Sequence, residues 1–121
     1  MNCQKETSVV SFNYMVEQSI NLDTLFQALA DETRRDILKR VSKAELSISK
    51  LDEPYKMSFA AIAKHVSVLE TARLITKRRE GKQQIISVVP KTVEVAASHL
   101  GLYEKMWTER FDALETLLKT N

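Results

Sequence analysis

Hydrophobic residues in the middle of the chain recur at the spacing of one helical face. Between Met57 and Leu74 this face is made by residues three or four positions apart, namely Ile62, Val66, Leu69 and Ala72. Ser58 stands in front of them, and a serine there can accept a hydrogen bond from a free backbone N–H at the start of a helix. The pattern therefore predicts an amphipathic helix over residues 58–72.

The opposite face of this predicted helix carries small, polar and basic side chains with little apolar surface. They are Phe59, Ala60, Lys64, His65 and Ser67. Such a face fits a DNA major groove, but many surface helices share it, and a histidine here can equally be a satisfied residue of the helix. The helix by itself indicates nucleic-acid binding only weakly, so the neighbouring elements matter more.

Upstream, two helices or one bent helix are predicted between residues 23 and 43. Their apolar face is formed by Leu25, Phe26, Leu29, Ile37, Leu38 and Val41. Asp23 and Asp31 are the expected N-caps. We expect Arg34 and Arg35 on the outer side, as solvated arginines rather than DNA contacts. Residues 1–20 follow no clean period, and there we expect only a short helix over about residues 13–19, packed on the core or on a partner subunit.

A short helix is predicted between Ser47 and Pro54. Ser47 is its expected N-cap, Leu51 is expected to point inward, and Pro54 closes it. The next three residues form a turn into the helix over residues 58–72. A short helix, a tight turn and a longer capped helix make a candidate helix-turn-helix.

After Leu74 the pattern changes from a helical period to alternation. Two strand-like runs surround Gly81, and they predict a β-hairpin with its tip at Glu80 to Gln83. The side chains expected to contact DNA from this hairpin are Lys77, Arg78, Arg79, Lys82 and Gln83. Long cations at such a tip can reach a phosphate backbone or the minor groove beside a recognition helix, as the wing of a winged helix does.

The last quarter of the chain predicts one long helix that begins at Pro90. Apolar residues, beginning with Val93 and Ala96, step by threes and fours along it over residues 91–119, like the seam of a coiled coil. A chain this small has little core left to bury such a stripe, so we expect a helix that pairs with a second subunit. The expected interface residues are Leu100, Tyr103, Trp107, Phe111, Leu114 and Leu118. A ligand-binding role for Trp107 and Phe111 is the lesser alternative.

Composition and charge narrow the class of protein. A chain of 121 residues with 44% hydrophobic and 28% charged residues is long enough for one folded domain, and it has no apolar run of the roughly 20 residues that cross a bilayer. The single cysteine, Cys3, suits a reducing cytoplasm. Seven basic residues face two acidic ones between Lys56 and Lys82, on a chain of net charge +2. This local excess is typical of a phosphate-binding surface, although a solvated charged face is equally compatible with it.

The central part of the sequence resembles a known family. The stretch Phe26-Gln-Ala-Leu-Ala-Asp-Glu-Thr-Arg-Arg-Asp-Ile-Leu38 resembles the opening signature of the bacterial and archaeal ArsR-type (arsenical-resistance-repressor) winged-helix regulators. The pieces that resemble its recognition helix and wing are Met57-Ser58, Lys64-His65-Val66, Val68-Leu69-Glu70 and Arg79-Glu80-Gly81-Lys82. The match covers residues 22–89, and residues 103–118 resemble the C-terminal helix of a branch that does not sense metals.

The resemblance implies a homodimer that binds a partly palindromic operator in double-stranded DNA, usually as a repressor. It places Ser58, Phe59, Ala60, Lys64 and His65 at the major groove and Arg78, Arg79, Lys82 and Gln83 at the wing. The chain departs from the family at three points. Lys56 and Arg73 stand where glycines are common, Phe59 and Ala60 replace a commonly polar pair, and Ile86 replaces a frequent aromatic.

Three other roles, namely metal binding, catalysis and protein docking, find less support in the sequence. No thiol occurs in Leu46–Leu51, where many family members bind metal, and Cys3, His65 and His99 are too scattered for a four-ligand site. A metal site would need Cys3 to act across a dimer, so we expect no metal and no cofactor. No paired acid and base, phosphate cradle or nucleophile motif indicates an enzyme. The alternative function is a winged helix that only docks proteins.

The sequence thus predicts a mainly α (α+β) winged helix-turn-helix protein without a membrane partner. We expect an N-terminal extension over residues 1–21, a DNA-binding domain over residues 22–90 and a dimerisation helix over residues 91–121. The inducing signal and any effector stay open.

Overall fold

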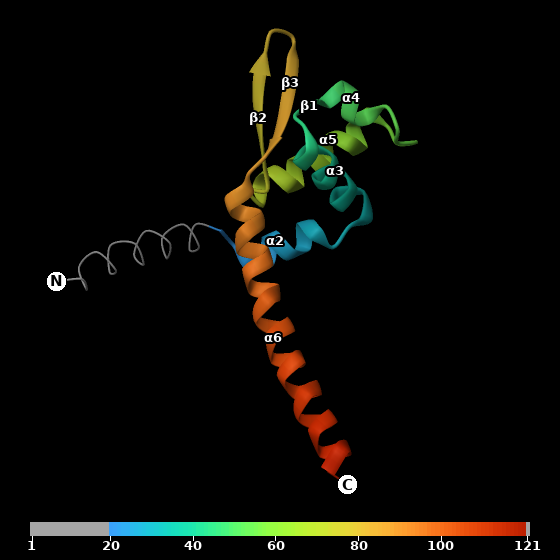
Figure 1. The fold of residues 1–121 in the computed structure, drawn as a ribbon. Coiled ribbons are helices and arrows are strands. Elements are labelled where there is room, and N and C mark those ends of the chain that lie inside the picture. Colours follow the sequence, from blue (N-terminus) through green and yellow to red (C-terminus); the bar gives the residue numbers. More distant parts are fainter. Residues whose placement is uncertain (1–19, 121) are drawn as a thin grey trace, which may run out of the picture.

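The computed structural model describes residues 20–120 of the chain. Its elements are α2 (Leu22–Leu29), α3 (Glu32–Lys43), β1 (Leu46–Ser47), α4 (Ile48–Asp52), α5 (Phe59–Thr71), β2 (Ile75–Glu80), β3 (Gln83–Val88) and α6 (Pro90–Thr120). Figure 1 shows a small helical body from which the β2–β3 hairpin rises at one end, while α6 extends far beyond the body at the other. This is the predicted winged helix-turn-helix with a hairpin wing and a long C-terminal helix. The short helix expected over residues 13–19 lies outside the described residues.

Short polar side chains start four of the helices. Asp31 Oδ2 accepts a hydrogen bond from the Arg34 N–H at 3.0 Å, and Ser47 and Ser58 cap α4 and α5 in the same way, as predicted. The prediction for α2 is wrong, because Asn21 and not Asp23 is its N-cap and accepts from the Thr24 N–H at 3.1 Å. Asp23 lies in the first turn, where a carboxylate still favours the helix dipole.

The predicted apolar face of α5 forms the centre of the core. Ile62, Val66 and Leu69 are fully buried and Ala72 is 3% exposed. The core residues that surround them include Leu25, Ile37, Leu51, Leu74, Ile75 and Ile86. Because α5 is fixed along this whole face, its opposite face keeps a constant orientation toward solvent.

The wing is part of a larger sheet than the sequence predicted. Strands β2 and β3 pair antiparallel from Ile75↔Val88 to Glu80↔Gln83, and β1 adds a third strand through Leu46↔Ile86, in the order β1-β3-β2. A strand of two residues is too short to show alternation, so the pattern could not reveal it. The hairpin turns at Gly81-Lys82, and Gly81 takes φ 63°, which suits a glycine at the first central position of a type II′ turn.

Arg73 ends α5 in a left-handed conformation that usually belongs to glycine. Its φ is 63°, and its N–H donates to the Glu70 carbonyl at 2.9 Å while the Leu74 N–H donates to the Leu69 carbonyl at 3.0 Å. This pair of bonds is a Schellman motif with Arg73 at C′. A non-glycine residue in this conformation costs about 1–2 kcal/mol. Lys56 takes no such φ, although it too stands where a glycine is common in the resembled family.

Helix α6 is divided into a packed start and a projecting remainder. Thr92, Val95 and Ala96 are buried against the body, whereas Val93, which belongs to the predicted stripe, is 37% exposed. From Leu100 onward the large apolar side chains of the helix are exposed, and Figure 1 shows that the later part of α6 projects beyond the body. The stripe therefore serves the chain's own core only at Ala96.

Candidate nucleic-acid interface

The outward face of α5 presents the predicted base-contacting residues to solvent. Ala60, Lys64 and Ser67 are exposed on the side opposite the buried Ile62, and Phe59 is 54% exposed in the first turn of the helix. Ser58 is exposed as well, but its Oγ is occupied in capping α5, where it accepts from the Ala61 N–H at 3.1 Å. Across the described part of the chain, Lys64 forms no ion pair. Its ammonium group is therefore free to meet an anion.

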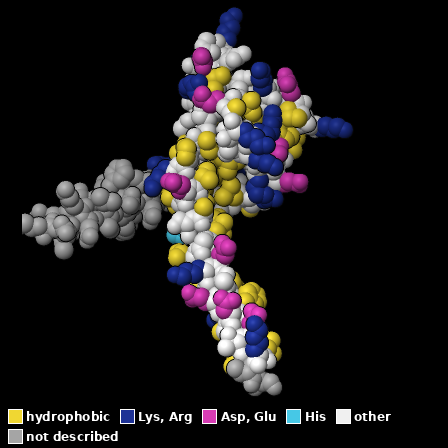
Figure 2. All heavy atoms as spheres, viewed as in Figure 1, with side chains coloured by type: hydrophobic (Ala, Val, Ile, Leu, Met, Phe, Trp, Pro, Cys, Tyr) yellow, Lys and Arg dark blue, Asp and Glu magenta, His cyan; other side chains and the backbone are white. Residues whose placement is uncertain are grey.

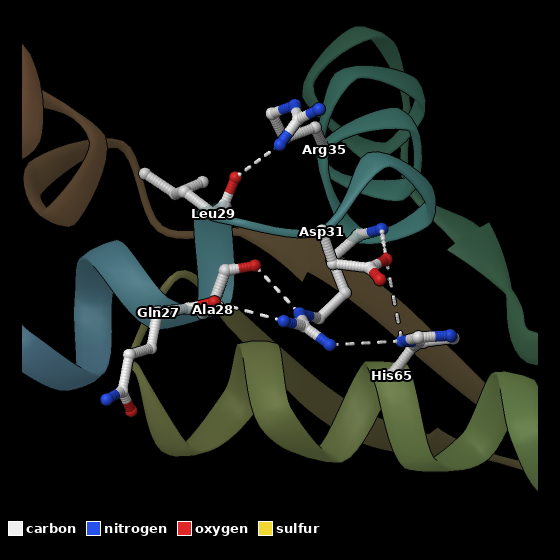
Figure 3. A network of polar contacts seen from close by, with 7 residues as sticks. Gln27, Ala28, Leu29, Asp31, Arg35 and His65 are labelled. Carbon is white, nitrogen blue, oxygen red and sulfur yellow. Dashed lines mark hydrogen bonds and ion pairs between the residues drawn. The ribbon is translucent and has the colours of Figure 1, made fainter.

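His65 lies in a polar network rather than standing free. Its Nδ1 is 3.3 Å from Nη1 of Arg34 and 3.8 Å from Oδ2 of Asp31 (Figure 3). The hydrogen bond from the backbone N–H of Arg34 holds the pKa of Asp31 below its ordinary value of 3.8, and the charge of Arg34 adds to this effect. With 21% of its side chain exposed, His65 can still offer one ring edge to the outside while it is held from within.

Arg34 and Arg35 fasten the end of α2, so the prediction that they are merely solvated is wrong. Arg34 donates from Nε to the Ala28 carbonyl at 2.7 Å and from Nη2 to the Gln27 carbonyl at 3.0 Å. Arg35 donates to the Leu29 carbonyl at 2.8 Å. The last carbonyls of a helix lack intrahelical partners, and the short link between α2 and α3 brings both arginines beside them. Two arginines shortly after the end of a predicted helix were the signal in the sequence that could have predicted these bonds to its last carbonyls.

Two of the predicted wing cations are already paired with carboxylates. Arg78 contacts Glu45, donates to Ser87 Oγ at 3.1 Å and lies 3.3 Å from Glu80. The hydrogen bond from Arg78, with a further one from Ser87, lowers the pKa of Glu45, and Glu45 in turn raises that of Arg78. Lys77 pairs with Glu70 at 3.3 Å.

The remaining cations lie at or near the hairpin tip. Lys82 is in the turn, is exposed, and has no ion pair within the described residues. Arg79 is exposed near the end of β2, and among the described residues its one side-chain hydrogen bond goes to the Gly81 carbonyl, at 3.4 Å. Gln83 begins β3 beside them and is exposed. Figure 2 shows a basic side chain at the tip and further basic side chains gathered on the helical body.

The projecting part of α6 exposes a broad apolar face. The six predicted interface residues are between 52% and 70% exposed. Trp107 and Phe111 contact each other with ring centroids 5.9 Å apart, and the Arg110 guanidinium lies over the Trp107 ring at 5.8 Å. The sequence analysis missed three further exposed apolar residues on this helix, Leu102, Met106 and Leu117.

An eleven-residue repeat explains how these residues, apart from Leu102, share one face. Leu100, Tyr103 and Trp107 recur eleven positions later as Phe111, Leu114 and Leu118. Met106 recurs in the same way as Leu117. Eleven residues make three turns of an almost straight helix, so the apolar face runs along α6 without winding around it.

Neither a metal centre nor a membrane span emerges from the described residues. Between residues 20 and 120, no three His, Cys, Asp or Glu side chains come together as they would to hold a metal ion. No helix in that range is long and apolar enough to cross a membrane.

Comparison with known proteins places the chain among transcription regulators. Residues 31–77 match the family model described as "Bacterial regulatory protein, arsR family". The chain is 30% identical over 96 residues to the HTH-type transcriptional regulator Rv2034 of Mycobacterium tuberculosis, across 79% of this chain and 87% of that protein. It is 28% identical to the transcriptional repressor SdpR of Bacillus subtilis, across 50% of this chain and 68% of that protein.

Solved structures agree with this placement. The ArsR-like transcriptional regulator from Rhodococcus sp. RHA1 superposes with a TM-score of 0.68 and 28% identity, across 83% of this chain and 92% of that one. The similarity extends beyond the helix-turn-helix, because this coverage exceeds the part that the family model matches.

Proposed function

Because the chain belongs to the ArsR family of bacterial regulatory proteins, we propose that it is a homodimeric repressor of transcription that binds a specific DNA operator. The observation that carries this proposal is the exposed face of α5, with its unpaired Lys64, on a helix whose other face is fully buried. A rigid helix with one free polar face can enter the major groove, and its side chains can then contact base edges.

Within the proposal, α5 chooses the sequence. Ser58, Phe59, Ala60, Lys64 and Ser67 face the bases, and His65 contributes through its exposed ring edge. Lys64 suits a guanine, whose O6 and N7 both accept hydrogen bonds. Phe59 and Ala60 offer apolar contact, which suits the methyl group of a thymine.

The wing fixes the register of the protein on the phosphate backbone or in the minor groove. Arg79 and Lys82 make the main contacts there, with Gln83 beside them. Lys77 and Arg78 contribute less, because each must first leave a carboxylate partner. The proposal thus ranks the DNA contacts of the five wing residues, which the sequence alone did not rank.

Dimerisation uses the apolar face of α6, with Leu100, Tyr103, Trp107, Phe111, Leu114 and Leu118 at its centre. An exposed apolar stripe of this length needs a partner, and a second copy supplies a stripe of the same repeat. Two recognition helices would then lie in successive major grooves, roughly 34 Å apart. Residues 22–90 form the DNA-binding domain in this scheme, residues 91–121 the dimerisation helix, and residues 1–21 an extension.

Repression follows if the operator overlaps a promoter. The similarity to SdpR, a protein named as a repressor, supports this direction of control. We assign no metal ion and no catalytic step to the protein, so its activity consists of binding DNA.

The proposal is tested by selecting binding sites from a random DNA pool with the full-length chain. We expect a partly palindromic consensus, and mobility shifts on that DNA should show dimer binding that exceeds binding to random DNA by at least a hundredfold. Affinity should fall steeply with salt, with log K decreasing by ~0.9 for each phosphate neutralised. No enrichment over many rounds, or binding that barely responds to salt, would contradict the proposal and favour a protein-docking role.

A further inference from the structure

A cavity of about 460 Å³ lies where the end of α5, the base of the wing and the first turn of α6 meet. It is at the opposite end of the hairpin from the tip, as the position of these elements in Figure 1 shows. The cavity is large enough for a small organic molecule, since ligand pockets typically span about 300–1,000 Å³. Nothing in the proposed DNA contacts uses it apart from Lys77 at its edge.

The cavity is apolar on one side. Ile20 and Ile75 are 6% and 1% exposed and line it together with the half-buried Val89. They form an apolar wall that exposes little area of its own, so the area removed from water on binding would be mainly that of a hydrocarbon or aromatic guest, at about 25 cal/mol for each Å².

The other side of the cavity is positively charged. Arg73, Lys77 and Lys91 line it, against the single carboxylate of Glu70. Glu70 is engaged by Lys77 at 3.3 Å, and Lys91 lies 3.8 Å from Glu94. Arg73 has neither an ion pair nor a side-chain hydrogen bond within the described residues. An anion in the cavity would therefore meet an unneutralised guanidinium.

Arg73 occupies this position at an energetic cost. Its φ of 63° is one that glycine adopts freely and that an L side chain rarely adopts. Strained residues of this kind concentrate at functional sites, where the side chain compensates for the backbone. At Arg73 the strained position sets an arginine among the residues that line the cavity.

Thr92 provides a second polar group from inside the cavity wall. The residue is 2% exposed, lines the cavity, and its hydroxyl has no hydrogen-bond partner within the described residues. It stands in the first turn of α6, whose leading N–H groups lack intrahelical acceptors and carry the positive end of the helix dipole. Because the Thr92 hydroxyl is not among the fully enclosed polar atoms of the described residues, it stays accessible from the cavity. An accessible hydroxyl, a helix N-terminus and a free guanidinium all favour the same kind of guest.

We propose that this cavity binds a small amphipathic carboxylate, with the acid group held by Arg73, Lys91 and Thr92 and the apolar body on Ile20, Ile75 and Val89. Apolar lining and convergent cations together exclude both a bare inorganic anion and a neutral hydrocarbon as the preferred guest. A carboxylate of this class is a natural effector, because organic acids are common metabolic signals and their charge matches the cavity.

The cavity is placed to alter DNA binding, a step that rests on the proposed function. The Val89 N–H donates to the Leu74 carbonyl at 2.8 Å and so ties the start of α6 to the end of α5. A guest between these elements and β2 changes how the wing and the recognition helix sit relative to α6. In the proposed dimer this angle sets the spacing of the two recognition helices.

The binding step is tested on the full-length chain without DNA, using octanoate as the probe. We expect saturable chemical-shift changes at the methyl groups of Ile75, Val89 and Thr92 in NMR spectra. Octanol, octylammonium, acetate and inorganic phosphate should each bind at least tenfold more weakly. Octanol and octylammonium lack the negative charge, and acetate and phosphate lack the apolar body. Equal binding of octanol or of phosphate would overturn the proposed class, and absence of saturation with octanoate would overturn the site.

Variants separate the site from general surface charge. Arg73→Gly removes the guanidinium and relieves the backbone, so the chain stays folded while octanoate affinity falls at least tenfold. Thr92→Val keeps the shape of the wall and should weaken octanoate several-fold. Lys43→Ala removes an exposed cation from the end of α3 and serves as the charge-matched control. Loss of affinity in Lys43→Ala equal to that in Arg73→Gly would show non-specific attraction and overturn the site.

Regulation is tested last, on the selected operator. Octanoate should change operator affinity at least threefold in the native chain and leave it unchanged in Arg73→Gly. Octanoate binding without any change in DNA affinity would overturn the regulatory part and leave both the cavity ligand and DNA binding in place. Failure to bind any DNA would contradict the proposed function, whereas the binding measured without DNA would still decide the cavity.

Discussion

The guanidinium of Arg34 on α3 donates a hydrogen bond to Nδ1 of His65 on α5, across 3.3 Å (Figure 3). Arginine is always a donor, so Nδ1 must be the acceptor and the imidazole proton must sit on Nε2. The same guanidinium holds the Ala28 and Gln27 carbonyls. One side chain of α3 thus links α5 to the end of α2.

This link predicts how His65 responds to substitution. His65→Ala leaves one arm of Arg34 without its acceptor, so the free energy of unfolding should fall by about 1 kcal/mol in chemical denaturation. His65→Gln restores an acceptor and should recover at least half of that loss. If His65→Gln were as stable as the native chain yet lost most of its preference for the operator, the main role of His65 would be to contact a base and not to bind Arg34.

Asp31 gives the fold a dependence on acid pH. Its pKa is lowered in the folded chain, so the unfolded chain binds the proton more readily. The stabilisation is fully present above the ordinary value of 3.8 and is lost as pH falls through the lower folded value. Asp31→Asn keeps the N-cap without the charge. Near neutral pH the free energy of unfolding of the native chain should exceed that of Asp31→Asn by at most about 0.5 kcal/mol, since exposed charges are screened. In denaturation series the difference should shrink as the pH falls below 3.8 and vanish once Asp31 is protonated in the folded chain as well, and a difference that does not shrink in acid would contradict the assignment.

The left-handed positions at Arg73 and Gly81 predict opposite effects of reciprocal substitutions. Both have φ 63°, and a Cβ added at Gly81 would meet nothing within 4 Å, so only the backbone decides. Arg73→Gly should raise the free energy of unfolding by about 1 kcal/mol, and Gly81→Ala should lower it by a similar amount. Thermal unfolding of both variants checks this, and a destabilised Arg73→Gly would mean that the arginine side chain contributes more to the fold than its backbone costs.

Lys64 and Arg79 should differ in how they affect DNA recognition. Arg79→Ala removes a phosphate contact and should weaken binding to operator and random DNA alike, with a salt slope reduced by about one. Lys64→Ala should weaken operator binding by about 1–3 kcal/mol and also blur the consensus. Arg78→Ala is the comparison within the wing and should have the smaller effect, because Arg78 is already paired with Glu45. Equal losses on both DNAs for Lys64→Ala would remove it from the base contacts.

The apolar face of α6 predicts a dimer that one charge can break. Trp107→Glu places a carboxylate in the middle of the face, so sedimentation should show a monomer at concentrations where the native chain is a dimer. Thr108→Glu is the matched control. Thr108 is adjacent to Trp107 but lies outside the eleven-residue repeat, so this variant should remain a dimer. A dimer that survives Trp107→Glu would place the interface elsewhere.

The sequence by itself determined those features that repeat along the chain. The three- and four-residue spacing of Ile62, Val66 and Leu69 set the buried face of α5, and the alternation around Gly81 set the wing. Caps at Asp31, Ser47 and Ser58 were visible because a capping side chain bonds within its own first turn. Local periods and local hydrogen bonds are written in adjacent residues, so they can be predicted from them.

Only the tertiary structure decided which side chains are free. Glu45 and Arg78 are far apart in the chain and meet because β1 joins the sheet beside β3, which removes one cation from the wing. Arg34 reaches His65 because α3 and α5 pack on the same core, and Arg73, Lys91 and Thr92 meet because α6 starts where α5 ends. No period records such meetings, because they depend on how elements distant in sequence are brought together by burying their apolar faces.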